Sequence, residues 1–287
     1  MSARILLGKE FAQRIAEETQ READILAAHY GRRPGLAVVL VGDNPASKVY
    51  IRGKEKACAA LNFRSQLVAL PEAATKANVI EAIEALNASD DIDGILVQLP
   101  LPPALMKDEA EILSHVSPRK DVDGFHPVNV GKLFLGQKGL VPCTPMGCLR
   151  MLEMAGIKID GQRAVVVGRS NIVGKPMAQL LLQRNATVTI CHSHTQELAS
   201  LTREADILVV AMGRPHFVTA DMVKSGATVI DVGINRVAPK KLLGDVDFDN
   251  VKEIAGAITP VPGGVGLLTV AMLMQNTAHA MRLRKEH

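Results

Sequence analysis

The chain has 287 residues, 47% hydrophobic and 22% charged, which is enough for two medium-sized domains that each bury a core. With six Phe, two Tyr and no Trp, these cores must be built from aliphatic side chains and Met, a composition typical of α/β proteins. The 33 basic residues are dispersed and nearly balance the 30 acidic ones, which argues against a nucleic-acid-binding surface.

The cysteines and the hydropathy pattern predict where the protein is found. No CxxC pair is formed by the four cysteines, which are Cys58, Cys143, Cys148 and Cys191. The first residues lack the pattern of a secretory signal, so we expect reduced thiols and a cytoplasmic location. No uncharged apolar run approaches the roughly 20 residues that a bilayer-spanning helix needs, so no membrane partner is expected.

Apolar runs rich in β-branched residues alternate with segments of helical periodicity. The expected strands are residues 36 to 42, 94 to 99, 164 to 168, 187 to 191, 206 to 211 and 228 to 233. The expected helices include residues 9 to 29, 45 to 61, 75 to 87 and 174 to 184. The second of these begins well, with Asn44 at the cap and Pro45 in the first helical position. Strands this apolar are buried on both faces, so we predict parallel sheets covered by helices.

A Pro-, Gly- and Asp-rich segment at residues 117 to 147 is interpreted as a hinge between two α/β units. We therefore predict a catalytic domain over residues 1 to 140 and a Rossmann-type domain over residues 141 to 266. The final apolar stretch, residues 267 to 287, is expected to form a helix that packs back on the first domain and completes it.

The segment "AVVVGRSNIVGKPMAQLLL" predicts a strand, a glycine turn and a helix, an arrangement that receives a phosphate on backbone N–H groups. Its spacing, Gly168-x-Ser170-x-x-x-Gly174, departs from GxGxxG, so the turn alone is a weak signal. The turn also resembles a P-loop, but Pro176 follows Lys175 where Ser or Thr would bind magnesium. Nucleoside triphosphate hydrolysis is therefore excluded.

The residues after the next strand favour NADP over NAD. An NAD enzyme usually places Asp or Glu there to bind the ribose 2′-hydroxyl, but this chain has Cys191, His192, Ser193 and His194. Arg169 and Ser193, together with His194, offer a cation and donors suited to a 2′-phosphate. The alternative for His192 and His194 is that they are ordinary solvated loop residues.

Five residues suggest a catalytic site in the first domain. Tyr50 and Lys54 in "SKVYIRGKEK" are four apart and share one helix face. A strand ends at Gln98, and ligands of open α/β sheets bind at the carboxyl ends of strands. Asp121 and Asp123 lie in the suspected hinge, from which a carboxylate can reach the same cleft. Singly, each is explained by a solvated lysine, a packed tyrosine or a turn aspartate, so the prediction depends on their coincidence.

The ordered motifs "YIRGKEKA", "DGILVQLPLP", "KDVDGFHP", "PCTP", "VVVGRSNIVGKPM", "VIDVGIN", "GDVDF" and "TPVPGGVG" resemble the bifunctional methylenetetrahydrofolate dehydrogenase/methenyltetrahydrofolate cyclohydrolase family nearly end to end. The resemblance implies two activities of one-carbon metabolism, a tetrahydrofolate substrate and NADP. A homodimer is also expected.

By this resemblance Lys54 is the catalytic lysine, Tyr50 stacks on the substrate, and Gln98 pairs with the lysine. Asp123 corresponds to the aspartate that holds the pterin. The expected cofactor residues are Gly168, Arg169, Ser170, Ser193 and Ile234. The expected loop contacts to substrate, beside the nicotinamide, are Pro262, Gly263 and Gly264.

The chain departs from the family pattern after the stretch "PVPGGVG", residues 260 to 266, which is called the glycine loop below. Where the family usually has "PGGVGPMT", this chain has Leu267 and Leu268 before Thr269, which predicts a looser start to the final helix.

Two alternatives remain open from the residues alone. One is an NADP-dependent dehydrogenase that resembles shikimate dehydrogenase, although "VQLPLP" and "PVPGGVG" are not expected there. The other is a folate- or nucleotide-binding protein without catalysis, against which the four intact site residues argue.

Overall fold

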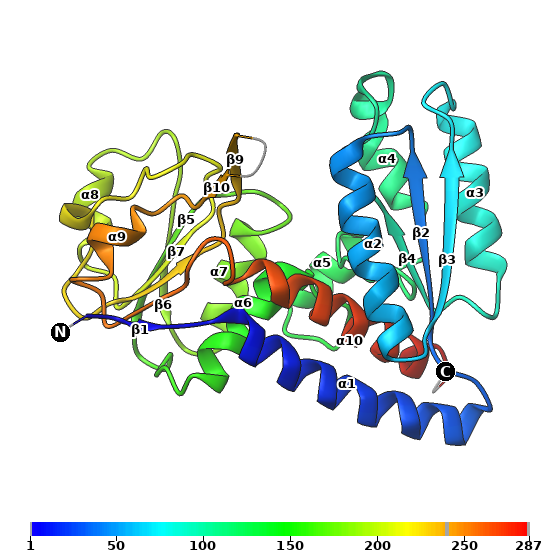
Figure 1. Cartoon of the computed structure of the whole chain (residues 1–287), viewed down its shortest axis with the longest axis horizontal. Helices are drawn as coiled ribbons and strands as arrows, with labels where there is room; N and C mark the ends of the chain where they lie inside the picture. Colours follow the sequence, from blue (N-terminus) through cyan, green and yellow to red (C-terminus); the bar gives the residue numbers. More distant parts are fainter. Residues whose placement is uncertain (1, 239–240, 286–287) are drawn as a thin grey trace. The chain divides into compact units, whose positions relative to one another are not determined.

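The computed structural model describes residues 2 to 238 and 241 to 285. The chain forms two compact units (Figure 1). One comprises Arg14–Cys143 and Val270–His287 and is called the catalytic unit below. The other comprises Met1–Gln13 and Thr144–Thr269 and is called the cofactor unit.

The catalytic unit is built on a parallel sheet with the order β3-β2-β4. Its strands are β2 (Gly35–Val41), β3 (Arg64–Leu70) and β4 (Gly94–Val97). All residues of β2 and β4 are buried, as their apolar runs predicted, whereas β3 alternates between exposed and half-buried positions because it is an edge strand. That alternation, with Arg, Ser and Gln among the first residues, hid β3 from the sequence analysis.

Helices cover both faces of this sheet. In this sheet β3 lies on one side of β2 and β4 lies on the other. The crossovers from β2 to β3 and from β3 to β4 therefore run in opposite directions across the sheet. Because both are right-handed, they place α2 (Pro45–Ala60) and α3 (Lys76–Ala88) on opposite faces. The predicted cap of α2 is confirmed, because Asn44 Oδ1 accepts from the Ser47 N–H at 3.4 Å. The remaining helical segments around this unit are α1 (Gly8–Tyr30), η1 (Pro103–Asp108), α4 (Glu109–Ser114), α5 (Pro127–Phe134) and α10 (Gly266–Lys285).

The cofactor unit holds a six-stranded parallel sheet with the order β1-β11-β8-β7-β5-β6. Its strands are β1 (Arg4–Ile5), β5 (Arg163–Val167), β6 (Thr187–Cys191), β7 (Ile207–Val210), β8 (Thr228–Asp231) and β11 (Ala257–Ile258). The other elements are α6 (Cys143–Met154), α7 (Gly174–Leu182), α8 (Leu198–Thr202), η2 (Ala220–Met222), β9 (Asn235–Ala238), β10 (Lys241–Leu243) and α9 (Phe248–Val251).

The strand order reverses between β5 and β7, because β5 pairs with β6 on one side and with β7 on the other. In an open α/β sheet such a reversal, at the carboxyl ends of the strands, is where a dinucleotide binds. The predicted Rossmann-type sheet is confirmed.

Two sequence-based expectations need correction. Residues 1 to 13 were assigned to the catalytic domain, but Arg4 and Ile5 pair with Ala257 and Ile258, so this segment completes the cofactor sheet. A two-residue strand is too short to show any periodicity. The supposed hinge at residues 117 to 147 contains α5 and the start of α6. Pro127 occupies the first position of α5, and His126 Nδ1 accepts from the Val128 N–H.

Candidate functional site

The catalytic unit brings Lys54 and Gln98 into direct contact. Lys54 Nζ donates to Gln98 Oε1 at 2.8 Å. The other end of the glutamine amide is also fixed, because Nε2 donates to the Leu99 carbonyl at 2.6 Å. The Gln98 backbone N–H donates to the Val39 carbonyl, which continues the pairing of β4 with β2. The glutamine therefore presents an acceptor oxygen to the lysine from a rigid strand end.

The environment of Lys54 disfavours its charged form. The side chain is partly buried, and this burial lowers its pKa, while the carboxylate of Asp123 and the thiol of Cys143 act in the opposite direction. Burial likewise raises the pKa of Asp123 to about 7, an effect that Lys54 opposes and Asp121 reinforces. Lys54 and Asp123 thus form an electrostatically coupled pair, and Asp123 titrates near neutral pH.

Asp121, also a candidate from the sequence, has a different function. It is 5% exposed, and its carboxylate accepts from the backbone N–H groups of Phe125 and His126 and from Asn129 Nδ2. These bonds fold the loop that carries Asp123 and leave little of the carboxylate for a ligand. Lys120 holds the same loop from the other side, because its buried ammonium donates to the carbonyls of Leu86, Asn87 and Ser89 at the end of α3.

Tyr50 lies one helical turn before Lys54 on α2, as the spacing predicts, and is 52% exposed. A half-exposed ring beside a partly buried amine offers a flat surface to a planar ligand.

In the cofactor unit, the turn after β5 is shaped by two glycines. Gly168 has φ +135°, and a Cβ there would lie 2.3 Å from the Ala211 carbonyl oxygen. A Cβ at Gly174, the first residue of α7, would lie 2.1 Å from the Gly168 carbonyl oxygen. Glycine at both positions is therefore required for the helix to start this close to the strand. Ser170 Oγ accepts from the N–H groups of Val173 and Gly174, so it fixes the turn that leads into α7.

The strand register brings the other predicted cofactor residues to one edge. Val167 pairs with Cys191, so Arg169 and Ser193 each lie two residues beyond neighbouring strand ends, and both are exposed. Ile234 follows β8 at the same edge and is 47% exposed. A cation, a hydroxyl and an apolar surface lie at this edge, and residues 192 to 195, directly after β6, include no carboxylate. This combination fits a dinucleotide with a 2′-phosphate.

Two aspartates of this edge were missed as site-forming residues. The Asp231 carboxylate accepts from the N–H groups of Gly233, Asp245 and Val246. Burial raises the pKa of Asp231 to about 7. The Asp245 carboxylate accepts from the N–H groups of residues 212 to 214 and from Asn235 Nδ2. Together they fix the loops on both sides of Ile234. The motifs "VIDVGIN" and "GDVDF" contain them, but their separation of 14 positions in the sequence concealed the pairing.

The glycine loop makes its close contacts with protein backbone. The Gly8 N–H donates to the Gly263 carbonyl at 2.8 Å, and a Cβ at Gly8 would lie 2.0 Å from the Gly264 oxygen. The start of α1 therefore packs closely against the backbone of this loop. Pro262 and Gly263 are exposed and Gly264 is buried. Helix α10 begins at Gly266, with Leu267 47% exposed and Leu268 fully buried.

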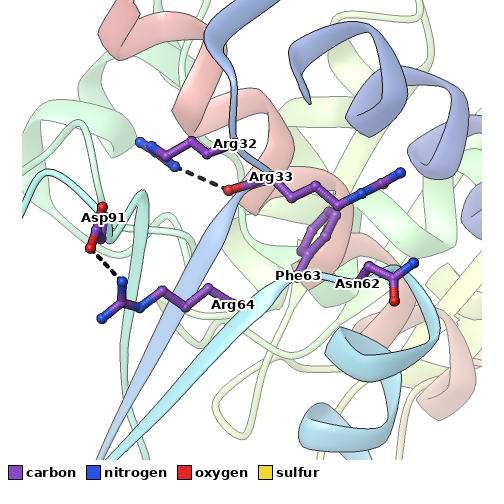
Figure 2. Close-up of a pocket in the computed structure, with 6 residues that line it drawn as sticks. All are labelled: Arg32, Arg33, Asn62, Phe63, Arg64 and Asp91. Atoms are coloured by element: carbon purple, nitrogen blue, oxygen red, sulfur yellow. Dashed lines mark hydrogen bonds and ion pairs between the residues drawn. The ribbon is translucent and has the colours of Figure 1, made fainter. Parts of the chain in front are cut away.

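A separate cavity of about 320 Å³ lies near the amino ends of β2 and β3 (Figure 2). It is lined by Arg32, Arg33, Asn62, Phe63, Arg64 and Asp91. The guanidinium groups do not converge there, because those of Arg33 and Arg64 point apart in Figure 2. Each arginine is also paired with a carboxylate, namely that of Asp93, Asp24 or Asp91. We assign no ligand to this cavity.

Among residues 2 to 238 and 241 to 285, no cluster of His, Cys, Asp and Glu side chains is arranged to hold a metal ion. In the same part of the chain, no helix has the length and apolar character needed to cross a membrane.

The fold and these residues define a two-domain α/β enzyme that uses a nicotinamide dinucleotide. Comparisons with known proteins identify one family. The model for the catalytic domain of tetrahydrofolate dehydrogenase/cyclohydrolase matches residues 6 to 123, and the model for its NAD(P)-binding domain matches residues 142 to 285. The bifunctional protein FolD of Moorella thermoacetica is 54% identical over 282 residues, which cover 98% of this chain and 100% of that protein.

Solved structures of similar proteins support the same family assignment. The bifunctional methylenetetrahydrofolate dehydrogenase/cyclohydrolase FolD of Campylobacter jejuni superposes with a TM-score of 0.94 at 45% identity, over 99% of this chain and 100% of the other. The Trypanosoma brucei enzyme, in complex with NADP and an inhibitor, gives a TM-score of 0.94 at 41% identity, and both chains are covered completely. The chain belongs to the tetrahydrofolate dehydrogenase/cyclohydrolase family.

Family membership confirms the resemblance inferred from the motifs, the two activities and NADP as the cofactor. It decides against both the shikimate dehydrogenase alternative and a protein without catalysis.

The raised pKa of Asp123 has a measurable consequence for stability. A carboxyl whose pKa rises from about 4 when unfolded to about 7 when folded stabilises the fold most at low pH. This contribution declines as the pH rises to 7. Asp123→Asn removes the buried charge, so it should melt above the wild type by a few degrees at pH 8, with a smaller difference at pH 5.

Thermal unfolding followed by circular dichroism at both pH values provides the measurement. Asp249→Asn is the matched control, since that side chain is 85% exposed, and it should show no such pH-dependent difference. A melting temperature for Asp123→Asn at or below that of the wild type at pH 8 would contradict the assigned cost of the buried carboxylate.

Proposed function

We propose that Lys54 is the general base of the cyclohydrolase reaction and that Gln98 and Asp123 hold the amine and the folate in place. The protein oxidises 5,10-methylenetetrahydrofolate with NADP to the methenyl compound and hydrolyses that product to 10-formyltetrahydrofolate. The single observation that supports the assignment most is the 2.8 Å bond from the partly buried Lys54 amine to Gln98 Oε1.

A lysine can act as a base only when its amine is neutral, and at its ordinary pKa of about 10.4 it is almost fully protonated at neutral pH. Burial lowers the pKa of Lys54, and the positive charge of the methenyl substrate should lower it further. A neutral amine can still donate one N–H to Gln98 Oε1. Its lone pair then remains free to accept a proton from water.

The hydrolysis then proceeds in a defined order. The water oxygen bonds to the amidinium carbon while Lys54 takes a proton from that water. The bond from this carbon to the N5 ring nitrogen breaks as N5 gains a proton and the formyl C=O forms. Overall, the cation and water give 10-formyltetrahydrofolate and one proton.

Asp123 and Tyr50 are proposed to orient the folate. With a pKa near 7, Asp123 is ionised in a large share of molecules at neutral pH, and its two oxygens suit the paired N–H donors of the pterin edge. The exposed ring of Tyr50 suits the aminobenzoate ring of the substrate. We further propose that Pro262, Gly263 and Gly264 contact the substrate through backbone that carries little side chain.

NADP, when bound, supplies the hydride acceptor for the first reaction. The proposed cofactor residues each have a separate function. Gly168 and Ser170 shape the phosphate turn, and Arg169 and Ser193 bind the 2′-phosphate. Ile234 provides an apolar surface on loops that Asp231 and Asp245 fix.

Lys54→Met should reduce hydrolysis of methenyltetrahydrofolate by at least about 100-fold, because general-base catalysis contributes 10²–10⁴-fold, while the affinity for NADP stays unchanged. The loss of methenyl absorbance measures hydrolysis, and fluorescence titration measures NADP binding. Lys56→Met is the matched control, since this lysine is on the same helix and exposed. Wild-type hydrolysis by Lys54→Met would remove this residue from the mechanism.

Arg169→Ala should weaken NADP by about tenfold or more and leave NAD almost unaffected, because a lost charge-assisted bond of this kind is worth 1.5–3 kcal/mol. The two dissociation constants are measured by titration. Arg163→Ala, at the amino end of the same strand, is the control and should change neither constant. Equal losses for both cofactors would show that Arg169 does not bind the 2′-phosphate.

A homodimer is proposed through β6. This strand is the outer strand of its sheet in the described part of the chain, it carries no charged side chain, and Thr187, Thr189 and Ile190 are exposed. Edge strands without charges tend to pair with another chain, and a twofold axis would place two copies of β6 side by side.

The four cysteine thiols are all free and buried, which accords with the proposed cytoplasmic location.

Ile190→Lys should shift the protein toward monomer in sedimentation velocity, because it places a cation in the proposed interface. Leu67→Lys, at a comparably exposed position of edge strand β3, should leave the oligomeric state unchanged. A dimer that persists in Ile190→Lys, or a wild-type monomer, would contradict this interface.

A further inference from the structure

Asn276 is a buried polar residue on α10 that the mechanism above does not use. It is 7% exposed. Its Nδ2 group donates to the Val122 carbonyl at 2.8 Å and to the Val141 carbonyl at 2.8 Å. Both protons of the amide are therefore occupied by main-chain acceptors that are distant from Asn276 in sequence. Val122 directly precedes Asp123, and Val141 lies two residues before Cys143.

The two segments that Asn276 joins are themselves in close backbone contact. Gly124 has φ +70°, and a Cβ there would lie 2.6 Å from both the Pro142 nitrogen and the Val141 carbonyl carbon. Cys143 Sγ donates to the same Val122 carbonyl at 3.3 Å and lies 3.5 Å from Asn276 Nδ2. The peptide group between Val122 and Asp123 is thus held by the side chains of Asn276 and Cys143. The residue after Asp123, Gly124, packs against the segment that contains Val141 and Pro142.

Neighbouring residues of α10 show that burial alone does not require this arrangement. Thr277 is fully buried as well, but its hydroxyl donates to the Leu273 carbonyl within the helix and, in the part of the chain that the structure describes, bonds to no other segment. Asn276, by contrast, uses both N–H groups of its amide to bond to segments outside its own helix. An apolar side chain of similar size would fill the same space, but would leave two buried carbonyls without these donors.

We propose that Asn276 is a positioning residue for Asp123: its amide fixes the main chain before Asp123 and the segment packed against Gly124, and thereby sets where the carboxylate meets the folate. This inference rests on the proposed function, in which Asp123 binds the pterin. Asn276 itself touches neither substrate nor cofactor in this account. Its effect is exerted through the two carbonyls.

The test separates positioning from general stabilisation by comparing KM with kcat. Asn276→Leu keeps the volume and removes both donors, so the KM for the folate substrate should rise about tenfold, the value of roughly one buried hydrogen bond. The KM for NADP should stay unchanged. A merely structural function would lower the fraction of active enzyme, and so kcat, at constant KM. Thr277→Val is the matched control and should leave both KM values at wild-type level.

Asn276→Ala is measured in parallel, because it leaves room for water at the two carbonyls and should fold even if the leucine variant does not. The same rise in folate KM is expected. A wild-type folate KM in either folded variant would overturn the inference.

A double-mutant cycle distinguishes the failure of this inference from that of the proposed function. If Asp123 binds the pterin, Asp123→Asn alone raises the folate KM, and adding Asn276→Leu has little further effect. If Asp123→Asn leaves the folate KM unchanged, the function of Asp123 is wrong. If Asp123→Asn raises it but Asn276→Leu does not, only the positioning inference is wrong. Fully additive effects would likewise overturn it.

Discussion

The hydrogen bond from Lys54 to Gln98 is the interaction on which the catalytic unit depends. It is possible only because Gln98 directly follows the end of β4, because α2 starts at Pro45 and presents Lys54 at its third turn, and because the glutamine amide is held at its other end by Leu99. Partial burial then disfavours the ammonium form, while Asp123 opposes that effect without cancelling it. In the proposed mechanism, the chemistry arises from solvent exclusion around two ionisable groups, and the sheet contributes by fixing their geometry.

In the cofactor unit the organising groups are carboxylates that bind the protein's own backbone. Asp231 and Asp245 accept a total of seven hydrogen bonds from backbone N–H groups and Asn235, and thereby order the loops at the carboxyl edge of the sheet. Ser170 does the same for the start of α7. Loops already ordered before a ligand arrives lose less conformational freedom on binding, which favours affinity. The exposed residues at this edge are the ones that we propose discriminate between dinucleotides.

Local patterns predicted a large part of this structure. The apolar runs located β2 and β4, the cap residues located the start of α2, and i,i+4 spacing placed Tyr50 beside Lys54. The rule for strand ends brought Gln98 to the same site. Long-range contacts were beyond these signals: nothing near Asn276 indicates that it bonds to Val122, and two residues cannot reveal β1. The alternating edge strand β3 and the helix α5 were missed because neither has a sustained apolar run.

The pairing of Arg4 with Ala257 sets a limit on when the cofactor sheet can close during synthesis. Strand β1 leaves the ribosome well before its partner strand β11, because Arg4 and Ala257 are 253 positions apart in the chain. Contacts of such high sequence separation form slowly, because a long loop must be ordered before they stabilise anything. The β5 to β8 core, whose strands are consecutive, can assemble earlier. Strand β1 therefore remains unpaired until β11 has been made. Because β1 is short, it exposes few unpaired backbone groups to which another chain could bind.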